Sequence, residues 1–466
     1  MTQHELTRRT CLKGAATVGI TGIAGCTGGG DGSGGGGGSN NSSSGGTGQS
    51  WVYDAEQNPG SEIRYQNLGD MDGDPAAAAN IKAFEEQYSD LTVDPVITDP
   101  SSVLKFARTR LQSQDNKIDV YSLQPYDIWP LAQEGYLEEV GRFIDDEHLD
   151  GLIDSVVESS MMSQPFHQDV PVRDGLYGVP GVGTEESFSP FVNQDVMEEG
   201  GYERGREFEN YSDFITVMKD IQSQGIVDSP VIFPYADARE GGEVFTSHLV
   251  TAGSMLFDGR TPRFDTDAAK TGIANFLSLF SEGVAPTGVT SLTEGTTTQQ
   301  FFQGNAAIMI NASSNLFLPG KDLPIDRPVE EVARIAGYPP VDGVSDAPSL
   351  QITPTNFSLS AFSLNKVNAA KWMNYYASKP AQKRELVDEG NLSLNLEVYE
   401  DSEVQEQVPY SDVLRKQLEN AVIVPMPNSG QVKQMMYDAV TSAIANGWSA
   451  DRLSSTLQSE AESLVQ

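Results

Sequence analysis

The chain has 466 residues, of which 66 are acidic and 30 basic, and its formal net charge at pH 7 is −36. Negative charge spread through the whole chain excludes nucleic acid as an expected partner, because the phosphate backbone would repel it. Repulsion within so acidic a body must be screened by dissolved salt, which is typical of halophilic proteins. The length is ample for two lobes that each bury a core.

The N-terminus carries signals for export. Arg8 and Arg9 precede an apolar segment, residues 12–24, which is too short to span a membrane and leads to Cys26. This order resembles a twin-arginine signal joined to a lipobox, so residues 1–25 are expected to be removed and Cys26 to be lipidated. Loss of three basic residues and one acidic residue would bring the charge to −38. With this acidic composition, such a leader suggests a salt-loving archaeon.

A glycine- and serine-rich segment, residues 26–50, follows the leader. It has too few apolar side chains to bury a core, so we expect a flexible tether. The other cysteine of the chain, Cys11, lies in the leader. No disulfide is then available to the mature protein, and its stability must come from its core.

The first part of the body alternates predicted strands and helices. Strands are predicted at residues 61–68, 91–97 and 118–123, with a helix starting at Pro75 and another at residues 103–111. This alternation predicts an α/β fold with a mostly parallel sheet. The acidic loop after the first strand does not fit an EF-hand calcium loop, because it lacks the required glycine and glutamate.

A second pattern of this kind lies at residues 296–315. A helix carrying Phe301 is stopped by Gly304, and an apolar run, residues 306–310, follows as a strand buried on both faces. Small polar residues, including Ser313 and Ser314, follow that strand. Ligands of open α/β sheets bind at the carboxyl ends of strands, so these residues are candidate ligand contacts.

Several segments together resemble a known family. The sequence F-x-x-G-x-A-A begins at Phe301, the form L-A-x-x-G-x-L covers residues 131–137, and a G-V-P sequence begins at Gly178. With the segment 422–428 they stand in the order found in extracellular solute-binding proteins of the maltose-binding type, which are receptors of ABC importers. The resemblance runs from about Ser61 to the C-terminus.

The resemblance implies a two-lobe periplasmic-binding-protein fold of type II. Each lobe would be a mixed, mostly parallel sheet flanked by helices, joined by hinge crossings. The first lobe would comprise residues 51–178 and 338–380, and the second residues 179–337 and 381–466.

The resemblance also implies a function: capture of a sugar or related polar solute in a cleft between the lobes, and its delivery to a membrane permease. It implies a lipid-anchored monomer at the extracellular face of the cytoplasmic membrane, with no cofactor and no catalysis. The expected ligand contacts are Asp70, Gln124, Tyr126, Asp127, Thr184, Glu185, Tyr235, Asp237, Ser313 and Ser314.

One departure bears on the ligand. Tryptophans often face the ligand in disaccharide receptors, and those places hold Leu123, Ser314 and Met436 here. Fewer stacking surfaces favour a smaller polyol or another polar solute over an oligosaccharide.

A secreted carbohydrate-active hydrolase is the alternative. The chain has no G-x-S-x-G and no H-E-x-x-H sequence, so the common serine hydrolase and zinc protease motifs are missing. A pair of catalytic carboxylates stays open, because acidic residues are so numerous.

Overall fold

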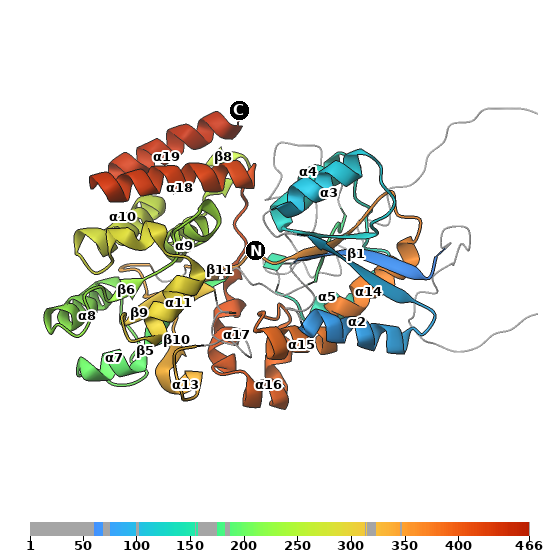
Figure 1. Ribbon diagram of the computed structural model, residues 1–466. Helices are drawn as coiled ribbons and strands as arrows, with labels where there is room; N and C mark the ends of the chain where they lie inside the picture. Colours follow the sequence, from blue (N-terminus) through green and yellow to red (C-terminus); the bar gives the residue numbers. More distant parts are fainter. Residues whose placement is uncertain are drawn as a thin grey trace, which may run out of the picture.

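Two lobes lie side by side and several segments run between them (Figure 1). The computed structural model describes residues 60–68, 75–98, 102–153, 155–156, 175–181, 187–312, 314, 323–344 and 347–465. The fold is of the α/β class, with a mixed sheet in each lobe. None of the helices within these ranges is long and apolar enough to cross a membrane.

The first lobe is built on a five-stranded sheet. In spatial order its strands are β2 (Thr92–Thr98), β1 (Glu62–Leu68), β3 (Val120–Leu123), β12 (Asn356–Leu359) and β4 (Val179–Pro180). β1 pairs in parallel with β2 and β3, whereas β12 runs antiparallel to β3 and β4. Every residue of β3 and β12 is buried, as expected of central strands covered on both faces.

In the part of the chain that the structure describes, helices surround this sheet, some in direct contact with it and others through neighbouring helices. They are α2 (Pro75–Gln87), α3 (Val103–Gln112), α4 (Pro125–Gln133), α5 (Asp146–Asp150), α14 (Lys366–Ala377) and α15 (Lys379–Glu389). Trp372 of α14 is fully buried, with its ring centroid 5.3 Å from that of Tyr65 and 5.1 Å from that of Phe84. Helical spacing predicts a core role for this tryptophan rather than a ligand contact, and its burial confirms the prediction.

The second lobe is built on a four-stranded sheet. Its strands, in spatial order, are β10 (Ala333–Ile335), β5 (Phe188–Asn193), β9 (Ile308–Ala312) and β6 (Val231–Ile232). β9 is buried along its whole length and follows Gly304, which has a φ of +79°. The predicted helix, glycine stop and buried strand are all present, because glycine alone adopts this backbone conformation without strain.

Helices surround this second sheet (Figure 1). They are α7 (Gln194–Glu199), α8 (Tyr211–Ser223), α9 (Ala238–Thr251), α10 (Asp267–Ser281), α11 (Glu294–Phe302), α13 (Val329–Val332), α18 (Ser429–Asn446) and α19 (Ala450–Val465), with the 3₁₀ helix η6 (Thr287–Ser291). A hairpin of β7 (Phe257–Asp258) and β8 (Thr261–Pro262) completes the lobe.

Between the lobes runs a small parallel pair, β11 (Leu350–Gln351) and β13 (Ala421–Val422). Near it lie η7 (Leu396–Glu400), α16 (Ser402–Gln407) and α17 (Ser411–Glu419), which follow α15 in the chain (Figure 1). Buried side chains of these elements, including Tyr399, Val404 and Leu418, join a core cluster that contains residues of both lobes, such as Trp372 and Met309.

The structure places the crossings between lobes later than the predicted boundaries. β4 still pairs with β12 of the first lobe, so the first crossing lies after Pro180 rather than at Gly178. The segment from Ala336 to Pro340 stays with the second lobe, where the amide of Tyr211 donates to the Pro340 carbonyl at 2.8 Å. Tyr338 also stacks edge-to-face on His248 of α9.

The third crossing differs most. Residues 381–389, which form most of α15, are predicted to belong to the second lobe, but α15 packs on α2, where Asn80 Nδ2 donates to Glu385 Oε1 at 3.2 Å. Arg384 also donates to Asn80 Oδ1 at 3.0 Å. A helix must bury its apolar stripe, and the pattern does not say which lobe will cover it. α15 therefore belongs with the first lobe, whereas α17 already contacts the second, where Gln417 Nε2 donates to the Ala336 carbonyl at 2.9 Å.

Candidate functional site

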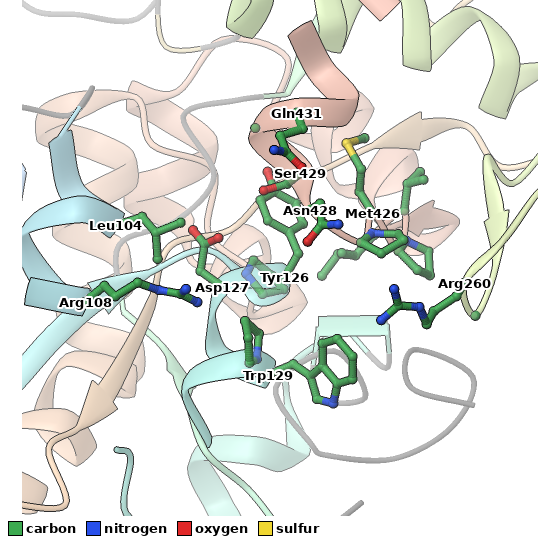
Figure 2. Close-up of a pocket in the computed structure, with 18 of the residues that line it drawn as sticks. Leu104, Arg108, Tyr126, Asp127, Trp129, Arg260, Met426, Asn428, Ser429 and Gln431 are labelled. Carbon is green, nitrogen blue, oxygen red and sulfur yellow. The ribbon is translucent and has the colours of Figure 1, made fainter. Parts of the chain in front are cut away.

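A cavity of about 580 Å³ lies between the lobes. From the first lobe it is lined by α3 and by the start of α4, and from the second by the β7–β8 turn and the segment leading into α18. Figure 2 shows side chains from both sets of elements facing one space. This size suits a small organic solute.

The wall formed by the first lobe depends on how α4 begins. Strand β3 ends at Leu123, and Pro125 starts the helix at its first position, where the missing N–H costs nothing. Tyr126, Asp127 and Trp129 then line the cavity. Asp127 is 8% exposed and lies in the first turn, where the helix dipole stabilises a negative charge. This wall offers two aromatic rings and one carboxylate.

The wall formed by the second lobe comes from two tight turns. Residues 423–427 are apolar and proline-rich, and Asn428 then adopts a left-handed conformation before α18 begins. Asn428 and Ser429 line the cavity, as does Gln431. In the β7–β8 hairpin Gly259 has a φ of +59°, which allows a two-residue turn that presents Arg260 to the cavity.

A buried ion pair lies next to this space. Lys433 Nζ of α18 is 2.6 Å from Glu243 Oε1 of α9, and the two side chains are 10% and 2% exposed. Gln351 of β11 donates to the other carboxylate oxygen of Glu243. Lys433 also donates to the Tyr126 hydroxyl at 3.1 Å, and its Nζ lies 5.4 Å from the Tyr126 ring centroid. One lysine thus links both lobes at the edge of the cavity.

The structure brings some of the predicted contacts together and separates others. Tyr126 and Asp127 line the cavity, whereas Gln124 precedes α4 as a half-buried residue outside the described lining. Asp237 caps α9 by accepting from the Glu240 amide at 2.9 Å, so it serves the helix rather than the cavity.

Tyr235 is not at the cavity either. It is fully buried in the core of the second lobe, where its ring stacks on Tyr437 with centroids 5.6 Å apart. Burial raises its pKa well above the usual value. Strand β6 ends at Ile232, three positions before Tyr235. Beyond the strand the chain turns, and the Tyr235 side chain lies in the core instead of on the cleft face.

The remaining predicted contacts are mostly outside the described residues. These are Asp70, Thr184, Glu185 and Ser313, and the lipidation site Cys26 is also among them. Ser314 is described and half-buried, and it is not part of the described cavity lining.

Sequence reasoning missed the cationic residues of the cavity. Arg108 lies on α3 and Arg260 in the β7–β8 turn, far apart in the chain, and only the packing of the lobes brings them to one space. Asn428 could have been found from sequence, because it ends the segment 422–428, which resembles a segment of the family, and Ser429 directly follows it. Lys433 had no signal in sequence, since a lysine on a helix is usually solvated.

The cavity lacks a catalytic pair among its described residues, where Asp127 is the single carboxylate. Burial raises the pKa of the Glu240 carboxyl to about 7, and repulsion by Glu294 and Asp237 contributes. Such a pKa would suit a general acid, yet Glu240 does not line the cavity. Glycoside hydrolysis needs two carboxyl groups flanking one bond, and the described lining supplies one.

Comparison with known proteins gives a family and a fold. A family model described as bacterial extracellular solute-binding protein matches residues 68–383. A maltose-bound MalE3 structure of T. maritima is 19% identical, with a TM-score of 0.70, covering 86% of this chain and 99% of that one. The sugar-binding protein MalE of Xanthomonas citri is 17% identical, with a TM-score of 0.71, covering 87% and 97%.

A third similar structure holds a smaller ligand. It is a solute-binding protein of an ABC transporter from Agrobacterium radiobacter in complex with ribitol. It is 16% identical, with a TM-score of 0.67, and the match covers 87% of this chain and 99% of that one. These likenesses show the fold.

Proposed function

The chain belongs to the bacterial extracellular solute-binding protein family, and from this membership we propose that it captures a sugar or polyol between its lobes for an ABC importer. The permease subunits of that importer are its proposed membrane partner. The observation that carries the proposal is the interlobe cavity, where aromatic rings of one lobe face polar groups of the other.

The chemistry of the lining suits such a solute. The rings of Tyr126 and Trp129 can stack on the C–H face of a sugar or polyol. The Asp127 carboxylate can accept bonds from hydroxyls, and Asn428 and Ser429 can exchange bonds with others. Similar structures that hold maltose and ribitol support a ligand of this class.

Capture would shift the relative position of the lobes. A ligand that bonds Asp127 on one lobe and Asn428 on the other makes more contacts when the lobes are close, and only such a difference favours the closed form. Rotation about the crossings would leave each lobe intact. The closed form is then the one that a permease would recognise. Of the contacts outside the described residues, Asp70, Thr184, Glu185 and Ser313 remain predictions.

Replacement of Asp127 by alanine tests the placement of the site. We expect binding of the solute to weaken by about 1–3 kcal/mol, because a charged hydrogen bond is lost. A thermal-shift panel of sugars and polyols would first identify ligands, since binding to the folded state raises the melting temperature. Unchanged affinity in Asp127→Ala would contradict the placement, and consumption of a ligand would favour the hydrolase alternative.

We also propose that lipid on Cys26 anchors a monomer at the extracellular face of the cytoplasmic membrane. The leader and the glycine-rich tether support this, because they would hold the body near the permease while leaving it free to turn. Mass spectrometry of the mature N-terminus tests the anchor. An unmodified residue 26, or a chain that keeps residues 1–25, would refute it.

A further inference from the structure

We infer that the interlobe cavity selects an acidic solute, a sugar that carries a carboxylate, and that Arg108 and Arg260 are the residues that set this specificity. This inference rests on the proposed function and narrows its ligand class. The two guanidinium groups extend toward the cavity from opposite sides, with Tyr126 and Trp129 between them (Figure 2).

The N–H donors of the Arg108 guanidinium are available to bond a ligand in this structure. Its nearest carboxylate among the described residues belongs to Glu134, with 3.9 Å between Nη2 and Oε1, which is too long for a hydrogen bond. Its Nε is buried and has no hydrogen-bond partner among the described residues. A buried donor of this kind costs free energy unless something bonds it, and a ligand in the cavity is placed to do so.

Arg260 is in a similar position on the opposite wall. Its Nη2 donates to the Val465 carbonyl at 2.6 Å, which fixes the side chain and uses one of five N–H donors. Among the described residues it has no carboxylate partner within 4.0 Å. The remaining donors of its planar group suit two-pronged bonding to a carboxylate.

The contrast with other arginines carries the argument. Acidic residues outnumber basic ones by more than two to one in this chain, so a carboxylate is usually close to any arginine. Arg206 lies 2.7 Å from Asp213, and Arg263, three residues after Arg260, lies 2.6 Å from Asp258. Among the described residues, Arg260 faces the cavity without such a partner, and Arg108 faces it with only the 3.9 Å contact to Glu134, so both are positioned for an anion from solution.

The rest of the described lining agrees with this charge. Lys105 adds a third cation, against the single carboxylate of Asp127. The first turn of α18 also faces the space through Ser429 and Gln431, and the positive end of a helix dipole favours negative charge. Rings and prolines around these cations require an apolar face on the same ligand. A carboxylated sugar combines the two properties.

Calorimetric titration of the full chain in detergent tests the inference. The probes are D-galacturonate and its 1,4-linked dimer, with D-galactose and its 1,4-linked dimer as neutral counterparts and galactose 1-phosphate as a second anion. We expect the acidic sugars to bind at least about tenfold more tightly than the neutral ones, as one added charged hydrogen bond implies. Arg108→Gln and Arg260→Gln should each reduce the acidic affinity by about tenfold, and by much more than they reduce the neutral affinity.

Two matched variants serve as controls. Arg110→Gln on α3 and Arg263→Gln beside the β7–β8 turn remove arginines that are paired with Asp115 and Asp258, and neither lines the cavity. They should leave every affinity unchanged. Neutral sugars that bind as tightly as the acidic ones would overturn the inference while leaving sugar capture standing. Tighter binding of the phosphate ester would overturn the carboxylate assignment, and failure of all five probes would overturn both the acidic specificity and the capture of sugars.

Discussion

Replacement of Lys433 by methionine is expected to lower the free energy of unfolding by about 3–5 kcal/mol. The change removes the cation that lies 2.6 Å from Glu243 Oε1 and leaves that carboxylate, 2% exposed, without its countercharge. Gln351 still donates to the other oxygen, but a neutral amide cannot offset the desolvation of a full charge. Denaturant unfolding at pH 7 measures the loss.

An exposed ion pair of the same length provides the control. Lys219 Nζ is also 2.6 Å from a carboxylate, that of Glu282, but the two side chains are 50% and 43% exposed. Lys219→Met should change stability by less than about 1 kcal/mol, because water already solvates both charges. Adding Glu243→Leu to Lys433→Met should recover much of the loss. Equal effects of the two lysine replacements would show that the buried pair is not the cause.

The Lys433 variant also bears on function. The same ammonium group donates to the Tyr126 hydroxyl across the interlobe gap, at 3.1 Å. Tyr126 lines the cavity, so the hydrogen bond from Lys433 fixes the position of one aromatic ring of the lining. Stability and ligand affinity should therefore fall together in Lys433→Met, whereas Lys219→Met should change neither.

Removal of salt is expected to unfold the protein. The full chain has a formal net charge of −36 and the expected mature chain −38, and repulsion among the carboxylates extends further as screening weakens. The screening length is about 3 Å at 1 M salt and about 30 Å at 0.01 M. The helical circular dichroism signal should decline on dialysis from molar to millimolar salt.

A control with sucrose distinguishes the screening of charges by salt from the general effect of solutes that are excluded from the protein surface. Salt should restore the signal on return to molar concentration, whereas sucrose at equal osmolarity should restore much less, because it does not screen charge. A signal that is unchanged between 1 M and 0.01 M salt would refute the expected dependence on ionic strength.

The sequence predicts local elements well wherever side-chain pattern and stop signals agree. The amphipathic pattern of residues 267–281 predicts a helix there, and α10 has these bounds. Thr266 caps the helix by accepting from the Ala269 amide. The buried strand after Gly304 is β9. Both depend on neighbours in the chain, which a sequence displays directly.

Contacts between segments that lie far apart in the chain are harder to predict from the sequence. The sequence gives no sign that α15 packs on α2, nor that Tyr235 turns into the core after the polar loop that follows β6. At the site, Tyr126 and Asp127 follow a recognisable strand end, and the sequence predicts them. Arg108 and Arg260 become part of one site only when two lobes close on a common space, which is a property of the tertiary fold.

Small-angle X-ray scattering with and without ligand tests capture between the lobes most directly. The probe is the sugar or polyol that gives the largest thermal shift, added at saturation in molar salt. We expect the radius of gyration to fall on binding, and Asp127→Ala to need more ligand for the same change, because closure depends on contacts to both lobes. A radius of gyration that stays the same at saturation would contradict capture by closure of the interlobe cavity.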